Sequence, residues 1–216
     1  RLLEFVSHWP VSANEKKPSN AKRISLRKPS LIIYKYTEKK TRKKLEKIIT
    51  DKTGKMLIIP LATMFGIETG EKEKYFASLL GFNEADIIVF DEEKPDEIRN
   101  QQFRYIVVLG GNTFQLLYKV EKYNLDTFIK NQIENGADYL GFSAGAYLAC
   151  PNIEYVKNFD DNNHIDNGDF SALGLTDKYV LCHFDMRGLA EIQMCRKFIG
   201  DEVELITIDN NQFVVL

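Results

Sequence analysis

The run 105–109, Tyr-Ile-Val-Val-Leu, constrains the fold of this chain more than any other feature. It is continuous, apolar and β-branched, which is typical of a strand buried on both faces of a parallel sheet. Parallel strands need crossover connections, and these are usually helices. Further strands are expected at 31–34, 56–60, 86–90, immediately before Ser143, and at 178–182, 203–208 and 212–216.

Stretches of helical pattern alternate with these strands. Helices are expected at 37–52, 71–80, 113–135 and 189–199, with a break near Asn124. Such alternation specifies a three-layer α/β fold, in which a mostly parallel sheet carries helices on both faces. A chain of 216 residues suits one such domain over 31–216, preceded over 1–30 by an N-terminal arm or added edge element.

The composition excludes several classes of function. The net charge is −2, so we expect no nucleic-acid partner and no attraction to an anionic membrane. The lysines within 37–52 fit the solvated face of a helix better than a nucleic-acid patch, because no aromatic side chains lie among them. No apolar run is long enough to span a bilayer. The three widely spaced cysteines predict free thiols in a cytoplasmic protein, with no metal site and no cofactor.

The segment around Ser143 contains the candidate catalytic nucleophile. Gly141-Phe142-Ser143-Ala144-Gly145 follows a buried strand and precedes a short helix. This is the Gly-x-Ser-x-Gly nucleophile elbow, a sharp strand-to-helix turn that exposes a serine hydroxyl above the sheet. The pattern alone is weak evidence, because a plain turn with small residues can also produce it. A catalytic role for Ser143 therefore requires a base and an oxyanion hole at neighbouring strand ends.

A serine needs a base to accept its proton. Of the histidines, His8 lies in the arm, His164 lies in an Asp/Asn-rich loop, and His183 directly follows a strand. His183 is therefore the best-placed base. Either Asp209, just past the strand 203–208, or Asp160, in the loop after the elbow helix, would orient its imidazole. The residues themselves leave this choice open.

A second glycine turn follows the central strand. Gly110 and Gly111 allow the backbone to approach a substrate closely, and their N–H groups could form an oxyanion hole with that of Ala144. Asn112 and Thr113 complete this turn and are candidates for substrate binding. A phosphate-binding loop is the alternative, but the spacing Gly-x-Gly-x-x-Gly is absent.

Four motifs together resemble the peptidase E (aspartyl dipeptidase) and cyanophycinase family. They are 105–117 (YIVVLGGNTFQLL), 141–146 (GFSAGA), 149–153 (ACPNI) and 181–184 (LCHF), and the resemblance covers roughly residues 55–216. It implies a class I glutamine amidotransferase-like or flavodoxin-like fold, with a serine where that fold more often has a cysteine.

The resemblance also implies roles for single residues. Ser143 matches the nucleophile and His183 the base, while Gly110, Gly111 and Ala144 match the oxyanion hole. Asp209 is preferred to Asp160 as the acid. Arg187 is the candidate for a substrate carboxylate, since a guanidinium pairs with a carboxylate through two hydrogen bonds.

The sequence therefore predicts a serine-type exopeptidase acting on small peptides, with α-aspartyl dipeptides as the finer expectation, in a monomer or homodimer. One alternative is an α/β-hydrolase esterase, but there the histidine lies late in the chain and follows the acid. The other is a binding module that has kept the fold and lost turnover.

Overall fold

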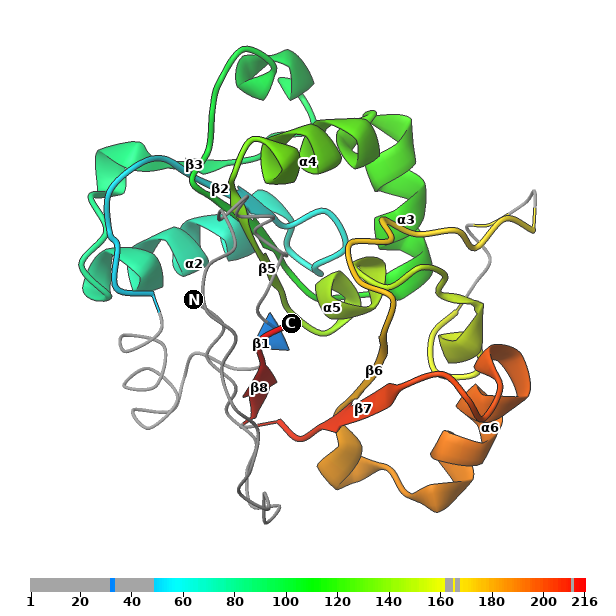
Figure 1. The fold of residues 1–216 in the computed structure, drawn as a ribbon. Helices are drawn as coiled ribbons and strands as arrows, with labels where there is room; N and C mark the ends of the chain where they lie inside the picture. The colour runs from blue at the N-terminus through cyan, green and yellow to red at the C-terminus, as the bar shows by residue number, and fades with distance from the viewer. Residues whose placement is uncertain (1–31, 34–48, 162–164, 166–167, 211) are drawn as a thin grey trace, which may run out of the picture.

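The fold is described from a computed structural model that covers residues 32–33, 49–161, 165, 168–210 and 212–216 (Figure 1). The expected arm at 1–30, His8, His164 and most of the expected helix at 37–52 lie outside the described residues. Residues 49–52 are described and are not helical. Here the tertiary contacts override the helical pattern, because the Tyr105 hydroxyl donates a hydrogen bond to the carbonyl oxygen of Asp51 (2.6 Å).

Six strands form the main sheet in the order β3-β2-β4-β5-β1-β8. All neighbours pair in parallel except β8, which is antiparallel to β1. A separate sheet contains β6 and β7, which are parallel to each other. The strands are β1 (Ile32–Ile33), β2 (Met56–Ile59), β3 (Ile87–Val89), β4 (Tyr105–Val108), β5 (Asp138–Gly141), β6 (Tyr179–Cys182), β7 (Leu205–Ile208) and β8 (Phe213–Val214).

Helices connect these strands and cover the sheet. The α-helices are α2 (Ile67–Leu79), α3 (Thr113–Lys122), α4 (Leu125–Glu134), α5 (Ala144–Leu148) and α6 (Leu189–Ile199). Short 3-10 turns are η1 (Glu84–Asp86), η2 (Pro95–Ile98), η3 (Glu154–Val156) and η4 (Phe184–Met186). The predicted break in the third helix is confirmed: Asn124 adopts a left-handed conformation (φ 51°) between α3 and α4.

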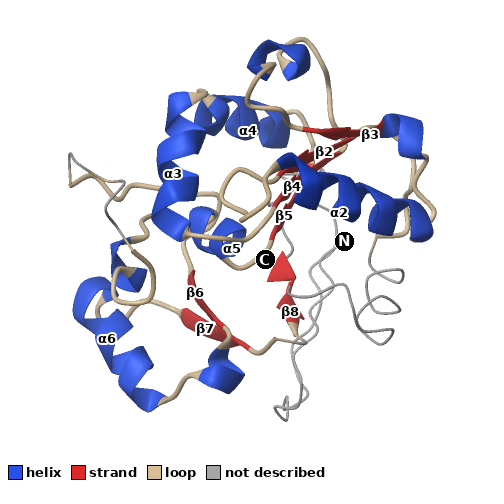
Figure 2. Cartoon of the chain, turned by 180° about the vertical axis from the view of Figure 1, so that it is seen from behind, coloured by secondary structure: helices blue, strands red, loops and turns tan. Residues whose placement is uncertain are grey.

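The core has two parts, one on each face of the main sheet. In β2, Leu57 and Ile59 belong to the larger cluster, which includes residues of α3, α4 and α5. Met56 and Ile58 belong to the smaller cluster, which includes Ala77 of α2. This alternation is expected because successive side chains of a strand point to opposite faces. Figures 1 and 2 show α2 on one face and α3 to α5 on the other, which is the predicted three-layer arrangement.

Two details differ from the prediction. α2 begins at Ile67 rather than at residue 71, directly after a loop formed by residues 60–66. β6 and β7 form their own sheet with α6 beside it (Figure 2), although their sequence pattern resembles that of the main strands. Among the described residues, no helix is long and apolar enough to cross a membrane.

Candidate active site

Ser143 lies at a sharp turn between β5 and α5. Its backbone has φ 51° and ψ −106°, a conformation that non-glycine residues rarely adopt. The turn is held by backbone hydrogen bonds from Gly145 N–H to the Phe142 carbonyl oxygen (2.8 Å) and from Ala146 N–H to that of Ser143 (2.9 Å). Strain of this kind persists only where the surroundings enforce it, and it is common at active sites.

Two glycines make this turn sterically possible. A Cβ atom on Gly141 would lie 2.5 Å from the carbonyl oxygen of Gly145, and a Cβ atom on Gly145 would lie 2.2 Å from that of Val108. The Tyr139 hydroxyl also donates a hydrogen bond to the Gly145 carbonyl oxygen (2.7 Å). The glycines of the motif are therefore required by the close approach of β4, β5 and α5.

His183 reaches the serine from the carboxyl end of β6. Its Nε2 atom lies 2.8 Å from Ser143 Oγ. The backbone of His183 is left-handed (φ 60°, ψ 35°), so the chain turns sharply here as it leaves the strand. The base and the nucleophile predicted from sequence thus lie within hydrogen-bond distance, although they come from different sheets.

The other ring nitrogen of His183 contacts Asn210. His183 Nδ1 lies 2.7 Å from Asn210 Oδ1, and Asn210 Nδ2 donates to Asp185 Oδ2 at 3.0 Å. The Asn210 backbone N–H also donates to Asp185 Oδ1 (3.2 Å). Since an ionised carboxylate only accepts hydrogen bonds, Asp185 orients the amide so that its oxygen faces His183. This network assigns the proton to Nδ1, so Nε2 carries the lone pair that accepts a proton from Ser143.

The two aspartates predicted to orient His183 make other hydrogen bonds. The Asp209 backbone N–H donates to the Gln212 side chain (3.1 Å). The Asp160 carboxylate accepts hydrogen bonds from the backbone N–H (2.9 Å) and the hydroxyl of Thr113. The structure thus places Asn210, the residue after Asp209, at Nδ1 of His183, where sequence reasoning expected an aspartate.

The Gly110–Gly111 turn lies beside Ser143. A Cβ atom on Gly110 would lie 3.1 Å from Ser143 Cβ. Gly111 has φ 126°, and a Cβ atom there would lie 1.8 Å from the carbonyl oxygen of Ala62. Ala144 is the first residue of α5, and N–H groups in a first helical turn have no partner within the helix. The three residues predicted for an oxyanion hole therefore lie around or next to the serine.

Asn112 and Thr113 make structural contacts. Asn112 caps α3 by accepting a hydrogen bond from Gln115 N–H (2.8 Å), and its amide donates to the carbonyl oxygen of Asp161 (2.8 Å). Thr113 is buried and bonded to Asp160. Both side chains thus fix the loop after the elbow helix to the start of α3.

Arg187 is half-buried and stacks on an aromatic ring. Its guanidinium carbon lies 3.9 Å from the centre of the Phe159 ring. This contact holds the side chain by cation–π attraction and packing.

Tyr147 joins the helix that follows Ser143 to the strand that carries His183. Its hydroxyl accepts a hydrogen bond from the backbone N–H of Cys182 (3.2 Å). Burial raises the pKa of the Cys182 thiol to about 12, so the thiol beside His183 stays protonated. All three cysteines are buried and free, as predicted.

A pocket of about 370 Å³ opens at Ser143. Ser143, Gly110 and Gly111 line it, together with four apolar residues, two threonines and Glu73. The Oε2 atom of Glu73 is buried and has no hydrogen-bond partner among the described residues, and burial raises the pKa of this carboxyl to about 7. The other residues are Met64, Phe65, Leu109, Phe142, Thr63 and Thr69.

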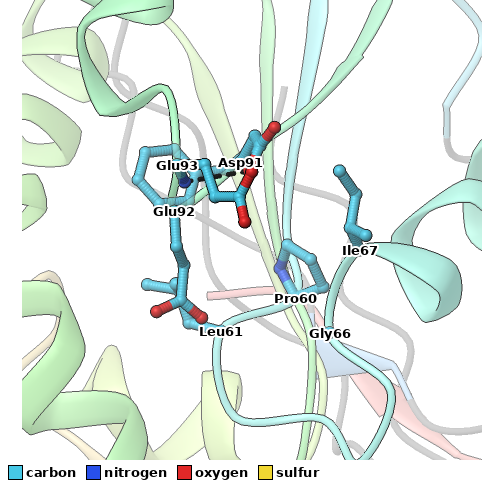
Figure 3. A pocket seen from close by; sticks show the side chains of 8 residues that line it. Pro60, Leu61, Gly66, Ile67, Asp91, Glu92 and Glu93 are labelled. Carbon is cyan, nitrogen blue, oxygen red and sulfur yellow. Dashed lines mark hydrogen bonds between the residues drawn. The ribbon is translucent and has the colours of Figure 1, made fainter.

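A second pocket, of about 380 Å³, lies beyond the ends of β2 and β3 (Figure 3). Asp91, Glu92 and Glu93 line it, but two of these residues have partners. Glu92 binds Lys119 (2.7 Å) and the Tyr123 hydroxyl (3.0 Å), and Asp91 accepts a hydrogen bond from the Glu93 backbone N–H (2.9 Å). Glu92 thus links the loop after β3 to α3, and Asp91 is bonded within that loop.

Comparison with known proteins identifies the family of this chain. The model of peptidase family S51 matches residues 30–216. The chain belongs to this family. It is 34% identical over 156 residues to an uncharacterized peptidase of Listeria monocytogenes, covering 70% of this chain and 74% of that protein.

Two further relatives match over shorter stretches. An uncharacterized peptidase of Pasteurella multocida is 36% identical over 115 residues, which cover 51% of this chain and 55% of the relative. Peptidase E of Salmonella arizonae is 43% identical over 79 residues, which cover 37% of this chain and 33% of the relative. The chain thus matches about half or less of the length of these two relatives.

Solved structures confirm the α/β fold of this S51 chain. A Listeria monocytogenes EGD-e protein assigned to peptidase E superposes with a TM-score of 0.66 at 25% identity, covering 87% of this chain and 94% of the other. A peptidase from an acI-B1 actinobacterium superposes with a TM-score of 0.59 at 17% identity, covering 87% and 83%. This second likeness bears on the fold alone.

Sequence reasoning missed three residues of the site: Asn210, Asp185 and Glu73. Asn210 could have been found by considering every polar residue just past the strand 203–208, because all of them lie at the same edge of the sheet. Asp185 is two residues past His183. Glu73 lies among charged residues of α2 and carries no local signal of burial.

Proposed function

We propose that this S51 chain is a serine hydrolase that cleaves small peptides with Ser143 as nucleophile and His183 as base. The observation that carries the proposal is the 2.8 Å contact between Ser143 Oγ and His183 Nε2, together with the contact of Nδ1 to Asn210 that makes Nε2 the proton acceptor. Membership of a peptidase family makes a peptide bond the expected target.

The arrangement supports a two-step acyl transfer. As Ser143 Oγ attacks the carbonyl carbon of the peptide, its proton passes to His183 Nε2. The carbonyl oxygen becomes an oxyanion, which backbone N–H groups of the Gly110–Gly111 turn and of Ala144 would stabilise. His183 then gives its proton to the leaving amine. Water, deprotonated by the same imidazole, hydrolyses the acyl-enzyme and releases Ser143.

In this proposal Asn210 orients His183 and Asp185 orients Asn210. The Asn210 oxygen binds Nδ1–H and so keeps the imidazole in the productive tautomer. A neutral amide stabilises the imidazolium less than a carboxylate does, but Asp185 adds a negative charge one hydrogen bond further away. Cysteine peptidases of the papain type use an asparagine in a comparable place.

The finer substrate proposal is an α-aspartyl dipeptide, with Arg187 as the group that binds the aspartyl carboxylate. It rests on the resemblance to peptidase E and on the partial exposure of Arg187, which is not among the residues that line the pocket of Ser143. The esterase alternative loses support because the chain belongs to a peptidase family. A binding module remains the competing proposal, and only a test of turnover separates the two.

Replacing Ser143 by alanine tests the proposed function. We expect Ser143→Ala to lose all measurable hydrolysis across a panel of dipeptides that includes Asp-Leu, Ala-Leu and Lys-Leu. Of the hydroxyl groups that line the pocket in the described part of the chain, that of Ser143 is the one that the structure places at a histidine nitrogen. A fluorophosphonate should label wild type at Ser143 and leave the variant unlabelled. Hydrolysis at the wild-type rate by a folded Ser143→Ala variant would falsify the proposal. Absence of both labelling and hydrolysis in wild type would favour the binding module.

A further inference from the structure

Glu73 reaches the pocket of Ser143 from α2. Thr69 and Glu73 are four residues apart, so they lie on the same face of the helix, and both line the pocket. Gly70 brings this face close to the sheet, because a Cβ atom there would lie 2.3 Å from Val89 and 3.1 Å from Pro60. The helix is therefore packed tightly enough to fix where the carboxylate lies.

The pocket is apolar apart from this carboxylate and a few hydroxyl and backbone groups. Among the described residues that line it, Glu73 is the only one with an ionisable carboxyl or amino side chain. No lysine, arginine or histidine of the described part of the chain lines the pocket, so no basic side chain there neutralises the charge of Glu73. A ligand group bound beside Glu73 therefore meets negative charge and apolar surface.

The buried oxygen of Glu73 has no hydrogen-bond partner in the part of the chain that the structure describes. A buried acceptor without a hydrogen bond costs about 1–3 kcal/mol, so such atoms are rare and call for an explanation. Burial also raises the pKa of this carboxyl to about 7, so that it is partly ionised at neutral pH. A cationic donor from a ligand would satisfy the oxygen and restore the ordinary, ionised state of the carboxyl.

We propose that Glu73 is the specificity residue of this pocket and binds the α-ammonium group of the peptide whose carbonyl Ser143 attacks. The proposal rests on the proposed peptidase function and adds to it that the enzyme requires a free amino terminus. In a peptide cleaved after its first residue, one carbon atom separates the ammonium group from the scissile carbonyl. A pocket of about 370 Å³ that contains Ser143, Gly110, Gly111 and Glu73 is of a size to hold both groups.

Two other ligand groups could meet Glu73, and each makes a different prediction. A lysine side chain also carries an ammonium group, but then binding would depend on the side chain and not on the amino terminus. A protonated Glu73 could donate a hydrogen bond to a carbonyl. In that case Glu73→Gln would keep its function, because a glutamine amide also donates.

The test compares free and N-acetylated dipeptides with otherwise identical sequences. Wild type should hydrolyse the free forms of Asp-Leu and Ala-Leu at least tenfold faster, by kcat/KM, than the acetylated forms. Glu73→Gln, which keeps the shape of the side chain, should lose at least tenfold on the free peptides, mainly through KM, and little on the acetylated ones. Glu71→Gln, an exposed carboxylate on the same helix, is the matched control and should behave as wild type.

A second measurement needs no turnover. L-alaninamide, which carries an α-ammonium group, should raise the melting temperature of wild type and of Glu71→Gln at pH 8. It should not raise that of Glu73→Gln, and N-acetylalaninamide should raise none of them. If wild type is neither labelled by a fluorophosphonate nor active, but shows this stabilisation, the peptidase proposal fails and the ammonium site stands.

Three results would overturn the ammonium site. One is a Glu73→Gln variant that still prefers free over acetylated peptides as wild type does. Another is a loss of rate confined to peptides whose first side chain is lysine. The third is equal stabilisation of wild type and Glu73→Gln by L-alaninamide.

Discussion

Ser143 and His183 lie 2.8 Å apart, but they belong to two regions that are built differently. The elbow side, residues 138–150, lies on a central strand, and the residues around the serine are almost all buried. The base side, residues 179–188 and 205–210, lies on a two-stranded sheet, where His183 and Asn210 are half-buried and Asp185 is exposed. The position of the nucleophile is thus fixed by backbone packing, whereas the position of the base depends on side-chain hydrogen bonds.

The largest effect that this difference predicts is on stability. Gly145→Ala would place a Cβ atom 2.2 Å from a backbone oxygen of β4, and backbone of a central strand has little room to move. We expect it to lower the free energy of unfolding by at least about 3 kcal/mol and to abolish labelling of Ser143. Urea unfolding followed by circular dichroism measures the first effect, and a fluorophosphonate measures the second.

The matched control is a glycine on the base side. Gly188 has φ −153°, and a Cβ atom there would approach only the Glu191 carboxylate, at 3.7 Å. We expect Gly188→Ala to cost less than about 1 kcal/mol. Equal costs for the two substitutions would show that the elbow is no more tightly packed than the base side.

The next effect is on catalysis and not on stability. Asn210→Ala removes the acceptor of His183 Nδ1–H, so the imidazole loses its orientation and its productive tautomer. We expect kcat to fall about 100-fold, while the free energy of unfolding changes by less than about 1 kcal/mol because the side chain is only half-buried. Steady-state kinetics on the best dipeptide and urea unfolding give the two numbers.

Asp209→Asn is the control for Asn210→Ala, and it also tests the aspartate preferred from sequence. The Asp209 contact that the structure shows is made by its backbone N–H, which the substitution leaves in place. We expect its kcat to stay close to that of wild type. The reverse result, in which Asp209→Asn is slow and Asn210→Ala is not, would restore Asp209 as the residue that orients His183.

The difference between the elbow side and the base side also explains which features could be predicted from the sequence. The requirement for Gly141 and Gly145 is steric, and steric requirements of a turn appear as glycines in a recognisable motif. His183 could be predicted as the base because it directly follows an apolar strand. The continuous apolar strands gave the layered fold, since burial on both faces leaves its mark on every residue of a strand.

Other features depend on tertiary contacts, which a local sequence pattern does not indicate. Asn210 lies in a run of four polar residues after β7, and only the turn of the chain decides which of them faces His183. Strands β6 and β7 have the apolar pattern of sheet strands, and pairing alone separates them from the main sheet. Glu73 is half-buried, with its Oε2 atom inaccessible, and it shares a pocket with residues of the loop 60–66 and of the turn at Gly110.

The smallest effect concerns the two carboxylates of the site. Asp185 is exposed and accepts hydrogen bonds from Asn210. The buried oxygen of Glu73, in contrast, has no partner within the described ranges, and burial raises the pKa of Glu73 from 4.5 to about 7. Because the folded chain holds this proton more tightly than the unfolded chain, the protein loses stability as the pH rises from about 4.5 to 7. A rise of this size corresponds to about 3 kcal/mol for a fully buried group, and partial exposure reduces it.

We therefore expect Glu73→Gln to raise the free energy of unfolding by about 1–2 kcal/mol at pH 8 and by almost nothing at pH 4, where glutamate is protonated in both states. Urea unfolding of wild type and variant between pH 4 and 8 measures the difference, and Glu71→Gln corrects for the change in net charge. A pH-independent difference would mean that Glu73 is already paired when ionised. That result would contradict the proposal that ionised Glu73 binds a cationic group of the ligand.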